Sequence, residues 1–212
     1  MFTVDNGSLP NHPIKVNDDC ELSMVDFSPL TAYNSLLRLK TKCSFGPADG
    51  VPNTFLKNVA SVVCEPLSFI FDSSFRCGVL PSSWLHAIVT PVFKKGVTSD
   101  PGNNRPIFMT CVCCRLMESI INNSFVHYLH NNELINDSQH GFLRKRSTCT
   151  NLLDSIHDWA VALNRKHSVD VIYIDFRKAF DTVSHPKLIS KLESYGFSGF
   201  FIALVKSVFI EP

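Results

Sequence analysis

The stretch best suited to chemistry is Tyr173-Ile-Asp-Phe-Arg-Lys-Ala-Phe-Asp181, in which two carboxylates follow an apolar run. Alternation predicts a strand over Val169–Asp175, with Asp175 at its exposed end and Asp181 nearby after a turn. A strand end holds a carboxylate rigidly, and Mg²⁺ is bound through one or two carboxylates plus substrate phosphates. The pattern therefore indicates metal-assisted phosphoryl transfer. The competing interpretation is a solvated Asp that caps the next turn.

Two loops earlier in the chain are basic. The first carries Lys94, Lys95 and Arg105, and the second carries Gly141, Arg144, Lys145 and Arg146. Between Pro91 and Thr150 there are seven basic and four acidic residues, which predicts a local positive surface. Lys and Arg on glycine-containing loops suit triphosphate or nucleic-acid backbone contacts, because such contacts are charge-assisted. The alternative for each cluster is an ordinary solvated loop.

Composition bounds the remaining function classes. The 212 residues are 45% hydrophobic, and 20 Lys and Arg balance 19 Asp and Glu, so the total charge points to no nucleic-acid or membrane partner. No window approaches the roughly 18 apolar residues of a membrane span, and the first residues lack the order of a secretory signal. We therefore expect an intracellular chain, cytoplasmic or nuclear, whose eight cysteines are reduced.

The elements that must position these residues follow from periodicity and caps. Residues 1–26 are polar, with five acids against one Lys, and predict a loose leader. Helices are expected from Pro29 to near Lys42, in two pieces over 54–77 around Pro66, over 112–130, from a Thr148 or Thr150 cap to near Lys166, over 184–195, and from Ser198 onward. An edge strand is expected over 86–93, in addition to the strand over 169–175.

Two weaker patterns compete for a function. Cys111, Cys114, His127 and His130 nearly spell a zinc finger, but the His pair is one residue too close and the segment reads as one amphipathic helix. Ser184, His185 and Asp175 could form a hydrolase triad, but no Gly-x-Ser-x-Gly elbow supports it. Both interpretations are therefore set aside.

Five stretches together resemble the reverse transcriptases of non-LTR (LINE-like) retrotransposons, in that family's order and spacing. They are SFGPADGVPNTFLK, GVLPSSWLHAIVTPVFKKG, NNRPIFMTCVCCRLMESII, QHGFLRKRSTCTNLL and DVIYIDFRKAFDTVSHPKLISKLESYGF. The resemblance covers about residues 27–209. It is carried by the ordered set rather than by any one stretch.

The resemblance implies an α+β, right-hand polymerase fold with mostly helical fingers, an incomplete palm sheet and no thumb. Residues 1–26 would be a polar leader or linker, 27–90 a helical N-terminal extension, 91–166 the fingers and 167–212 the start of the palm. Template RNA, a DNA primer, deoxynucleoside triphosphates and the rest of a retrotransposon polyprotein would be the partners. Mg²⁺ would be the cofactor, with Mn²⁺ as a substitute.

The same resemblance implies roles for individual residues. Asp175 matches the first catalytic metal ligand, and the Phe176 carbonyl would add a backbone ligand. Phe180 matches the catalytic-site aromatic that screens the nucleotide sugar. Lys94 and Arg105 correspond to fingers residues near the triphosphate, while Gly141, Arg144 and Arg146 correspond to template or backbone contacts. Asp181 matches the family pattern but is not assigned as a metal ligand.

The sequence also departs from the family's pattern. Asn104 stands at an aromatic position, Phe108 at a small polar one, and Leu143 at an Arg position that Arg144 could fill only with a shift of one residue. After Phe209 the sequence ends before any Ala-Asp-Asp hairpin or thumb, so half of a two-metal site is missing. We therefore expect an RNA-directed DNA polymerase domain that is inactive alone. The alternative is a non-catalytic retrotransposon remnant with at most weak nucleic-acid binding.

Overall fold

A computed structural model describes residues 8–9, 25–41, 50–176 and 179–209 of the chain. Most of the expected leader and part of the first family-like stretch lie outside these residues. The described elements are mixed helix and antiparallel strand, which confirms the α+β class. They are α1 (Pro29–Leu37), α2 (Asn53–Asn58), α3 (Ala60–Cys77), β1 (Ile88–Phe93), β2 (Asn104–Met109), α4 (Val112–Asn131), α5 (Thr148–Asn164), α6 (His185–Ser194) and α7 (Gly199–Phe209), with short 3₁₀ turns at Ser82–Trp84 and Pro101–Asn103.

The first helix begins where its cap predicts. Ser28 Oγ accepts a hydrogen bond from the Thr31 N–H, and Pro29 occupies the first helical position. Asp26 accepts further hydrogen bonds from Thr31 Oγ1 and from Ser28, which hold the pKa of its carboxyl below the usual value. The helix ends at Leu37, earlier than the expected end near Lys42.

The next segment forms two helices, but the break lies at Val59 rather than at Pro66, which sits inside α3. An interior proline removes one helical hydrogen bond, and α3 compensates by burying Leu67, Phe71 and Phe75. Gly78 ends α3 as expected, with a φ of +65°. A Cβ there would lie 2.8 Å from Ala203 Cβ, so glycine also permits the close approach of α7.

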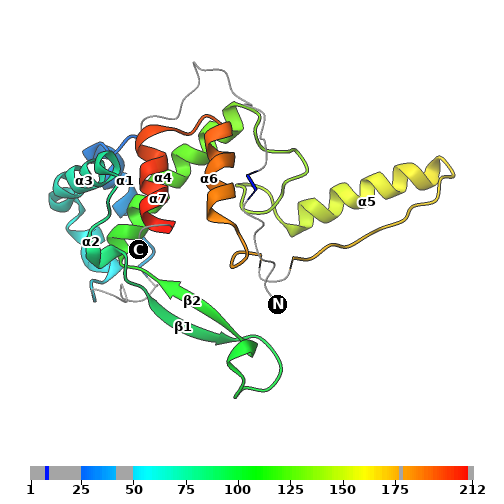
Figure 1. Ribbon diagram of the computed structural model, residues 1–212, viewed down its shortest axis with the longest axis horizontal. Coiled ribbons are helices and arrows are strands. Elements are labelled where there is room, and N and C mark those ends of the chain that lie inside the picture. Colours follow the sequence, from blue (N-terminus) through cyan, green and yellow to red (C-terminus); the bar gives the residue numbers. More distant parts are fainter. Residues whose placement is uncertain (1–7, 10–24, 42–49, 177–178, 210–212) are drawn as a thin grey trace.

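The core lies between α1, α3, α4, α6 and α7, and aromatic rings dominate it (Figure 1). Phe71 packs between Phe27 and Trp84, with ring centroids 6.0 and 5.8 Å away. On the other side of the core, Phe197 lies 4.8 Å from Phe125 and 4.9 Å from Tyr128 on α4. These contacts attach the C-terminal helices to α4 across a long stretch of sequence.

The expected edge strand is present as β1, and it pairs in antiparallel register with β2. The sequence predicts a turn-rich loop over 100–106 and no strand before the helix at Val112, so β2 is an element that the sequence analysis missed. Pro91 and Pro106 face each other in the ladder, and neither has a backbone N–H to donate. Pro106 therefore hides the strand pattern of Asn104–Met109 in the sequence. The two strands project from the helical body as a hairpin, exposed on both faces (Figure 1).

The predicted strand over Val169–Asp175 is wrong, because residues 168–176 are extended but unpaired. A strand exists only through a ladder with a neighbour, and β1 and β2 form the only sheet within the described part of the chain. The apolar side chains that would face a sheet are instead exposed, at 84% for Ile172 and 86% for Tyr173. Alternation of apolar and polar residues indicates a propensity to form a strand, but it does not show whether a neighbouring strand is present to pair with.

Helix α5 projects from the body, and the extended segment returns below it (Figure 1). Its N-cap is Ser147, not Thr148 or Thr150, and the Ser147 and Thr150 side chains exchange hydrogen bonds with each other's backbone N–H. No residue of α5 is buried, and Leu152, Leu153, Ile156 and Leu163 are exposed. In the described ranges no helix is both long and apolar enough to cross a membrane.

We predict that Phe197→Ala lowers the free energy of unfolding by about 3–5 kcal/mol, because it opens a cavity among three aromatic rings. Urea denaturation followed by circular dichroism measures this change. Phe180→Ala is the matched control, and it should cost less than about 0.5 kcal/mol because Phe180 is 81% exposed. Equal losses for the two variants would contradict the packing described here.

Candidate nucleic-acid interface

The hairpin brings two of the candidate nucleotide-binding residues together. Arg105 pairs with Val92 across the ladder, and a hydrogen bond of 2.9 Å from Lys94 N to Asn103 O extends the pairing past β1. Side chains alternate between faces along a strand, so Lys94 and Arg105 lie on the same face as diagonal neighbours. Both are exposed, and no ion pair joins either to another described residue. The hairpin tip is therefore a cationic projection.

The second basic loop, residues 136–147, is attached to α5 by a buried histidine. At its start Asn136 Oδ1 accepts from Ser138 N at 2.9 Å, which makes a local turn. In its first half the buried His140 lies 2.9 Å through Nδ1 from Thr150 Oγ1 and 3.1 Å through Nε2 from Asp154 Oδ2. Because Thr150 belongs to the cap of α5, one imidazole holds the loop to that helix.

The two candidate arginines of this loop have different surroundings. Arg146 donates to the Asp137 carbonyl, and its guanidinium lies 3.9 Å from that residue's carboxylate, so its charge is partly compensated within the loop. Arg144 donates from Nη2 to the neutral Asn123 Oδ1 at 2.7 Å, and within the described residues it makes no ion pair. Arg144 is therefore the arginine whose charge remains available to a ligand.

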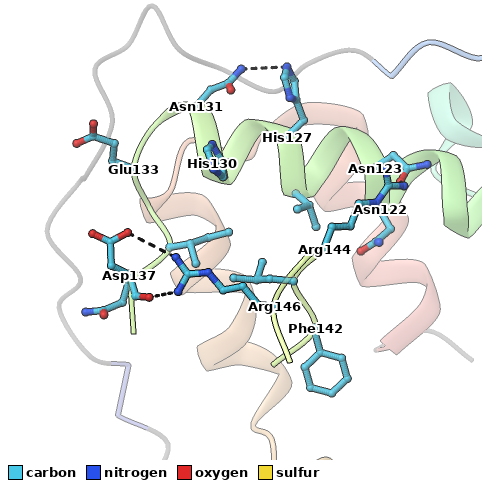
Figure 2. A pocket seen from close by; sticks show the side chains of 14 residues that line it. Asn122, Asn123, His127, His130, Asn131, Glu133, Asp137, Phe142, Arg144 and Arg146 are labelled. Atoms are coloured by element: carbon cyan, nitrogen blue, oxygen red, sulfur yellow. Dashed lines mark hydrogen bonds and ion pairs between the residues drawn. The ribbon is translucent and has the colours of Figure 1, made fainter. Parts of the chain in front are cut away.

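Both arginines line one open pocket of about 1240 Å³ between the loop and the C-terminal half of α4. Figure 2 shows Arg144 beside Asn122 and Asn123 at one end, with Glu133 and Asp137 at the other. The helix contributes Asn122, Asn123, Val126, His127, His130 and Asn131. The chain that follows contributes Glu133 and Ile135 before the loop, and Asn136, Asp137, Phe142, Leu143, Arg144 and Arg146 within it. Charged side chains thus lie at both ends of the pocket, with His130 and Arg146 between them.

The sequence interpretation missed the α4 side of this pocket. Asn123, His127 and Asn131 recur every four residues, with Asn122, Val126 and His130 beside them, which defines one helical face. That polar stripe is visible in the sequence, but the sequence analysis predicts only one amphipathic helix there and assigns the stripe no role. That this stripe lies across a pocket from the basic loop is set by the fold and cannot be read from the sequence.

Gly141 is not the residue that turns the loop. The left-handed conformations fall on Phe142 and Lys145, each with a φ of 63°, and Gly141 contributes its carbonyl, which accepts from Gln139 Nε2 at 3.1 Å. A left-handed φ is uncommon for a bulky residue such as Phe. Leu143, at the position where the resemblance implies an Arg, lines the pocket together with Arg144.

Asp175 and Phe176 lie at the end of the extended segment 168–176, and both are exposed. A carboxylate and a backbone carbonyl are the oxygen donors that Mg²⁺ prefers, so the chemistry of these two donors fits that ion. Across the described part of the chain, however, no three His, Cys, Asp or Glu side chains gather as a metal-binding group. These two donors alone are fewer than the oxygen ligands that such an ion takes.

Phe180 contacts the basic loop. Its ring packs edge-on against Phe142, with centroids 6.3 Å apart and planes at 90°. Both rings are otherwise exposed, at 81% and 92%. The structure thus joins the candidate sugar-screening aromatic to the Gly141–Arg146 loop, whereas the hairpin with Lys94 and Arg105 lies apart from segment 168–176 (Figure 1).

The zinc-finger pattern does not form a site. Cys111 and Cys114 are buried at the start of α4, where Cys111 Sγ accepts from the Cys114 N–H, while His127 and His130 are exposed near its other end. Burial and the nearby Glu118 carboxylate raise the pKa of the Cys114 thiol to about 12. Cys111 and Cys114 are free cysteines in the core.

We predict that Cys114 resists alkylation at pH 8, because only a minute fraction of a thiol with a pKa of about 12 is ionised there. The exposed Cys149 is the internal control and should label rapidly. Mass spectrometry of iodoacetamide-treated chain, native and in denaturant, measures both rates. Labelling of Cys114 in the native chain as fast as Cys149 would overturn this assignment.

Comparison with known families finds a match over more than half of the chain. The reverse transcriptase (RNA-dependent DNA polymerase) family matches residues 92–209. This range includes Lys94 and Arg105 of the hairpin, the basic loop, the pocket residues and Asp175. It also contains four of the five stretches on which the sequence resemblance rests, in whole or in part.

Individual relatives come from mobile elements. The chain is 27% identical over 187 residues to a probable RNA-directed DNA polymerase from transposon BS of Drosophila melanogaster, covering 88% of this chain and 19% of that protein. It is 26% identical to the RNA-directed DNA polymerase from mobile element jockey of the same species, covering 74% of this chain and 17% of that protein. It is 29% identical to a Pol polyprotein from the type-1 retrotransposable element R2 of Popillia japonica, covering 56% and 16%. The chain therefore spans about a fifth or less of the curated relatives it matches.

Proposed function

Since the chain belongs to the reverse transcriptase (RNA-dependent DNA polymerase) family, we propose that it is the template- and nucleotide-contacting part of an RNA-directed DNA polymerase of a non-LTR retrotransposon. The observation that carries this proposal is the pocket in which the family's basic loop presents Arg144 without a carboxylate partner. An uncompensated guanidinium in an open pocket is suited to a backbone phosphate.

The parts of a right-hand polymerase are proposed as follows. Residues 27–90 form a helical N-terminal extension, 91–166 the fingers, and 167–212 the start of the palm. Support comes from the unpaired segment 168–176, whose exposed apolar side chains suit burial in a larger sheet. Further palm strands and a thumb would have to come from outside the described residues.

Within this proposal Lys94 and Arg105 contact the triphosphate from the hairpin, and Arg144 contacts the template backbone. Phe180 screens the nucleotide sugar, supported by its edge-on contact with Phe142, which lies in the basic loop. Arg146 has a different part. Its interactions with Asp137 make it a residue that positions the loop.

Reverse transcriptase domains generally use divalent metals, and we propose that Asp175 and the Phe176 carbonyl supply ligands for one. Bound ions would lower the pKa of the attacking hydroxyl and stabilise the leaving phosphate. Asp175 is held out in solvent by an exposed segment, where it can reach an ion carried by a nucleotide. The remaining ligands would come from other carboxylates and from substrate phosphates.

A non-catalytic remnant with weak nucleic-acid binding is the second candidate. The observation in its favour is the absence, throughout the described residues, of a group of three metal-binding side chains. The two candidates predict the same phosphate contacts and differ in metal-dependent chemistry.

We predict salt-sensitive binding of an RNA template annealed to a DNA primer, because phosphate contacts release counterions. Arg144→Gln should lower the slope of log K against log salt by about 1. Lys145→Gln is the matched control, because this substitution removes one positive charge from the same loop, at a residue that does not line the pocket. Fluorescence anisotropy over a salt series measures the slope, and equal slopes for the two variants would refute the role of Arg144.

We predict that residues 1–212 alone do not extend a primer, because one Asp and one carbonyl cannot hold two ions at the spacing that in-line displacement requires. The measurement is Mg²⁺-dependent deoxynucleotide incorporation on an RNA template. Asp170→Ala is the control, an exposed acid in the same segment. Incorporation that survives Asp170→Ala and is abolished by Asp175→Ala would show that the 212 residues are catalytically sufficient.

The metal role of Asp175 has a test that needs no turnover. Fe²⁺ in place of Mg²⁺, with deoxynucleoside triphosphate, hydrogen peroxide as oxidant and ascorbate to regenerate Fe²⁺, generates hydroxyl radicals that cut the backbone beside the bound ion. We expect cleavage near residue 175 that is lost in Asp175→Ala and kept in Asp170→Ala. Identical cleavage patterns in both variants would exclude Asp175 as a ligand.

A further inference from the structure

Ser147 follows directly after the three basic residues of the second loop, Arg144, Lys145 and Arg146. The proposed function uses the charge of this loop and leaves the hydroxyl of Ser147 without a role beyond the helix cap. Protein kinases whose substrate clefts are acidic select serines that have arginine three residues before them and a second basic residue two before, because each cation pairs with a carboxylate of the kinase. The charge pattern therefore marks Ser147 as a substrate for a kinase of this class.

The structure presents the Ser147 side chain for such a reaction. The residue is exposed, and its backbone is extended, with a φ of −153° and a ψ of 172°. Its Oγ accepts a hydrogen bond of 3.3 Å from the Thr150 N–H and donates its proton to no other atom in the described part of the chain. Thr148, by contrast, is already the first residue of α5. The reachable hydroxyl in an extended segment is that of Ser147.

Access by an enzyme requires the first turn of α5 to open, and this opening disturbs no core. No residue of α5 is buried. The contact of His140 Nε2 with Asp154 Oδ2, at 3.1 Å, lies beyond the first turn and still attaches the loop to the helix. Segments with few buried contacts open at a small free-energy cost. The loop and the start of α5 can therefore enter a cleft while the helical body stays folded.

We propose that Ser147 is phosphorylated by a protein kinase that selects basic residues before its target. In this reaction Ser147 Oγ attacks the γ-phosphorus of ATP, and the bond from that phosphorus to the β–γ bridging oxygen breaks. ADP leaves, and the hydroxyl proton passes to a carboxylate base of the kinase. The kinase recognises the substrate through charge-assisted hydrogen bonds to Arg144, Lys145 and Arg146.

The phosphate on Ser147 changes the charge of the loop. It carries about −1.5 to −2, which cancels at least half of the positive charge of the three basic residues before it. Arg144 donates only to the neutral Asn123 and has no carboxylate partner among the described residues, so its guanidinium is available to a phosphate in the same loop. This regulatory effect rests on the proposed function, because it removes the charge that the template backbone would otherwise contact.

The modification is tested on the whole chain with ATP, Mg²⁺ and the catalytic subunit of cyclic-AMP-dependent protein kinase, which prefers basic residues before serine. We expect tandem mass spectrometry to find phosphate at Ser147. Ser147→Asn should take up none there and should keep the cap of α5, because asparagine is a good N-cap residue. Ser138 is the internal control, an exposed serine of the same loop that follows Asp137 instead of a basic residue.

The recognition by charge has its own control. Arg144→Gln should slow phosphorylation by about tenfold, the loss of one charge-assisted contact, whereas Lys95→Gln removes a charge from the hairpin and should leave the rate unchanged. Phosphate on Ser138 as fast as on Ser147, phosphate on Thr148 instead, no phosphate in the loop, or an unchanged rate in Arg144→Gln would each overturn the proposal.

The regulatory effect is measured by fluorescence anisotropy with the RNA template annealed to a DNA primer. We expect the phosphorylated chain to bind about tenfold more weakly than the unmodified chain. Ser147→Asn treated with kinase and ATP is the control and should bind as before. Unchanged affinity after complete phosphorylation would refute the regulatory effect. The proposed function is judged separately, since an unmodified chain without salt-sensitive binding would contradict that function, while the mapping of phosphate to Ser147 needs no nucleic acid.

Discussion

The packing of α4 between two sets of helices is the constraint on which the rest of the molecule depends. One face of α4 contacts Phe197 through Phe125 and Tyr128, and the hydrogen bond of 2.8 Å from Tyr128 Oη to the Tyr195 carbonyl connects it to the end of α6. Because this face is fixed, the opposite face must present its amides and imidazoles to solvent. The basic loop lies against that face, so α4 forms one wall of the pocket.

Buried apolar side chains are concentrated in the helical body, and most candidate site residues lie outside it. The helical body around Phe71 and Phe197 has a continuous core, whereas the hairpin, α5 and segment 168–176 have almost none. All but one of the candidate site residues lie on these weakly packed parts or on the loop between α4 and α5. This exposure supports the proposal that these segments receive a nucleic acid. The exposed apolar side chains on α5 and at Ile172 also offer a surface that further protein or substrate could cover.

The sequence predicted what local rules determine. Ser28 and Pro29 fixed the start of α1, Gly78 the end of α3, and the 3.6-residue period the extent of α4. It failed where the outcome depended on a distant partner. Strand propensity at Val169–Asp175 found no neighbour to pair with, Asn104–Met109 became a strand because β1 lay beside it, and the Asn123–His127–Asn131 stripe gained a meaning only when Arg144 met it across the pocket. Of the candidate residues, the sequence named those of the loop and missed those of the helix for the same reason.

Hydrogen–deuterium exchange with and without an RNA template annealed to a DNA primer tests the central claim most directly. That claim is that α4, the 136–147 loop and the hairpin form one nucleic-acid-facing side of a reverse transcriptase. We predict slower exchange in residues 122–147 and 88–109 on binding, with no change in α1 and α3. Protection confined to α1 and α3, or unchanged exchange at saturating nucleic acid, would contradict the account.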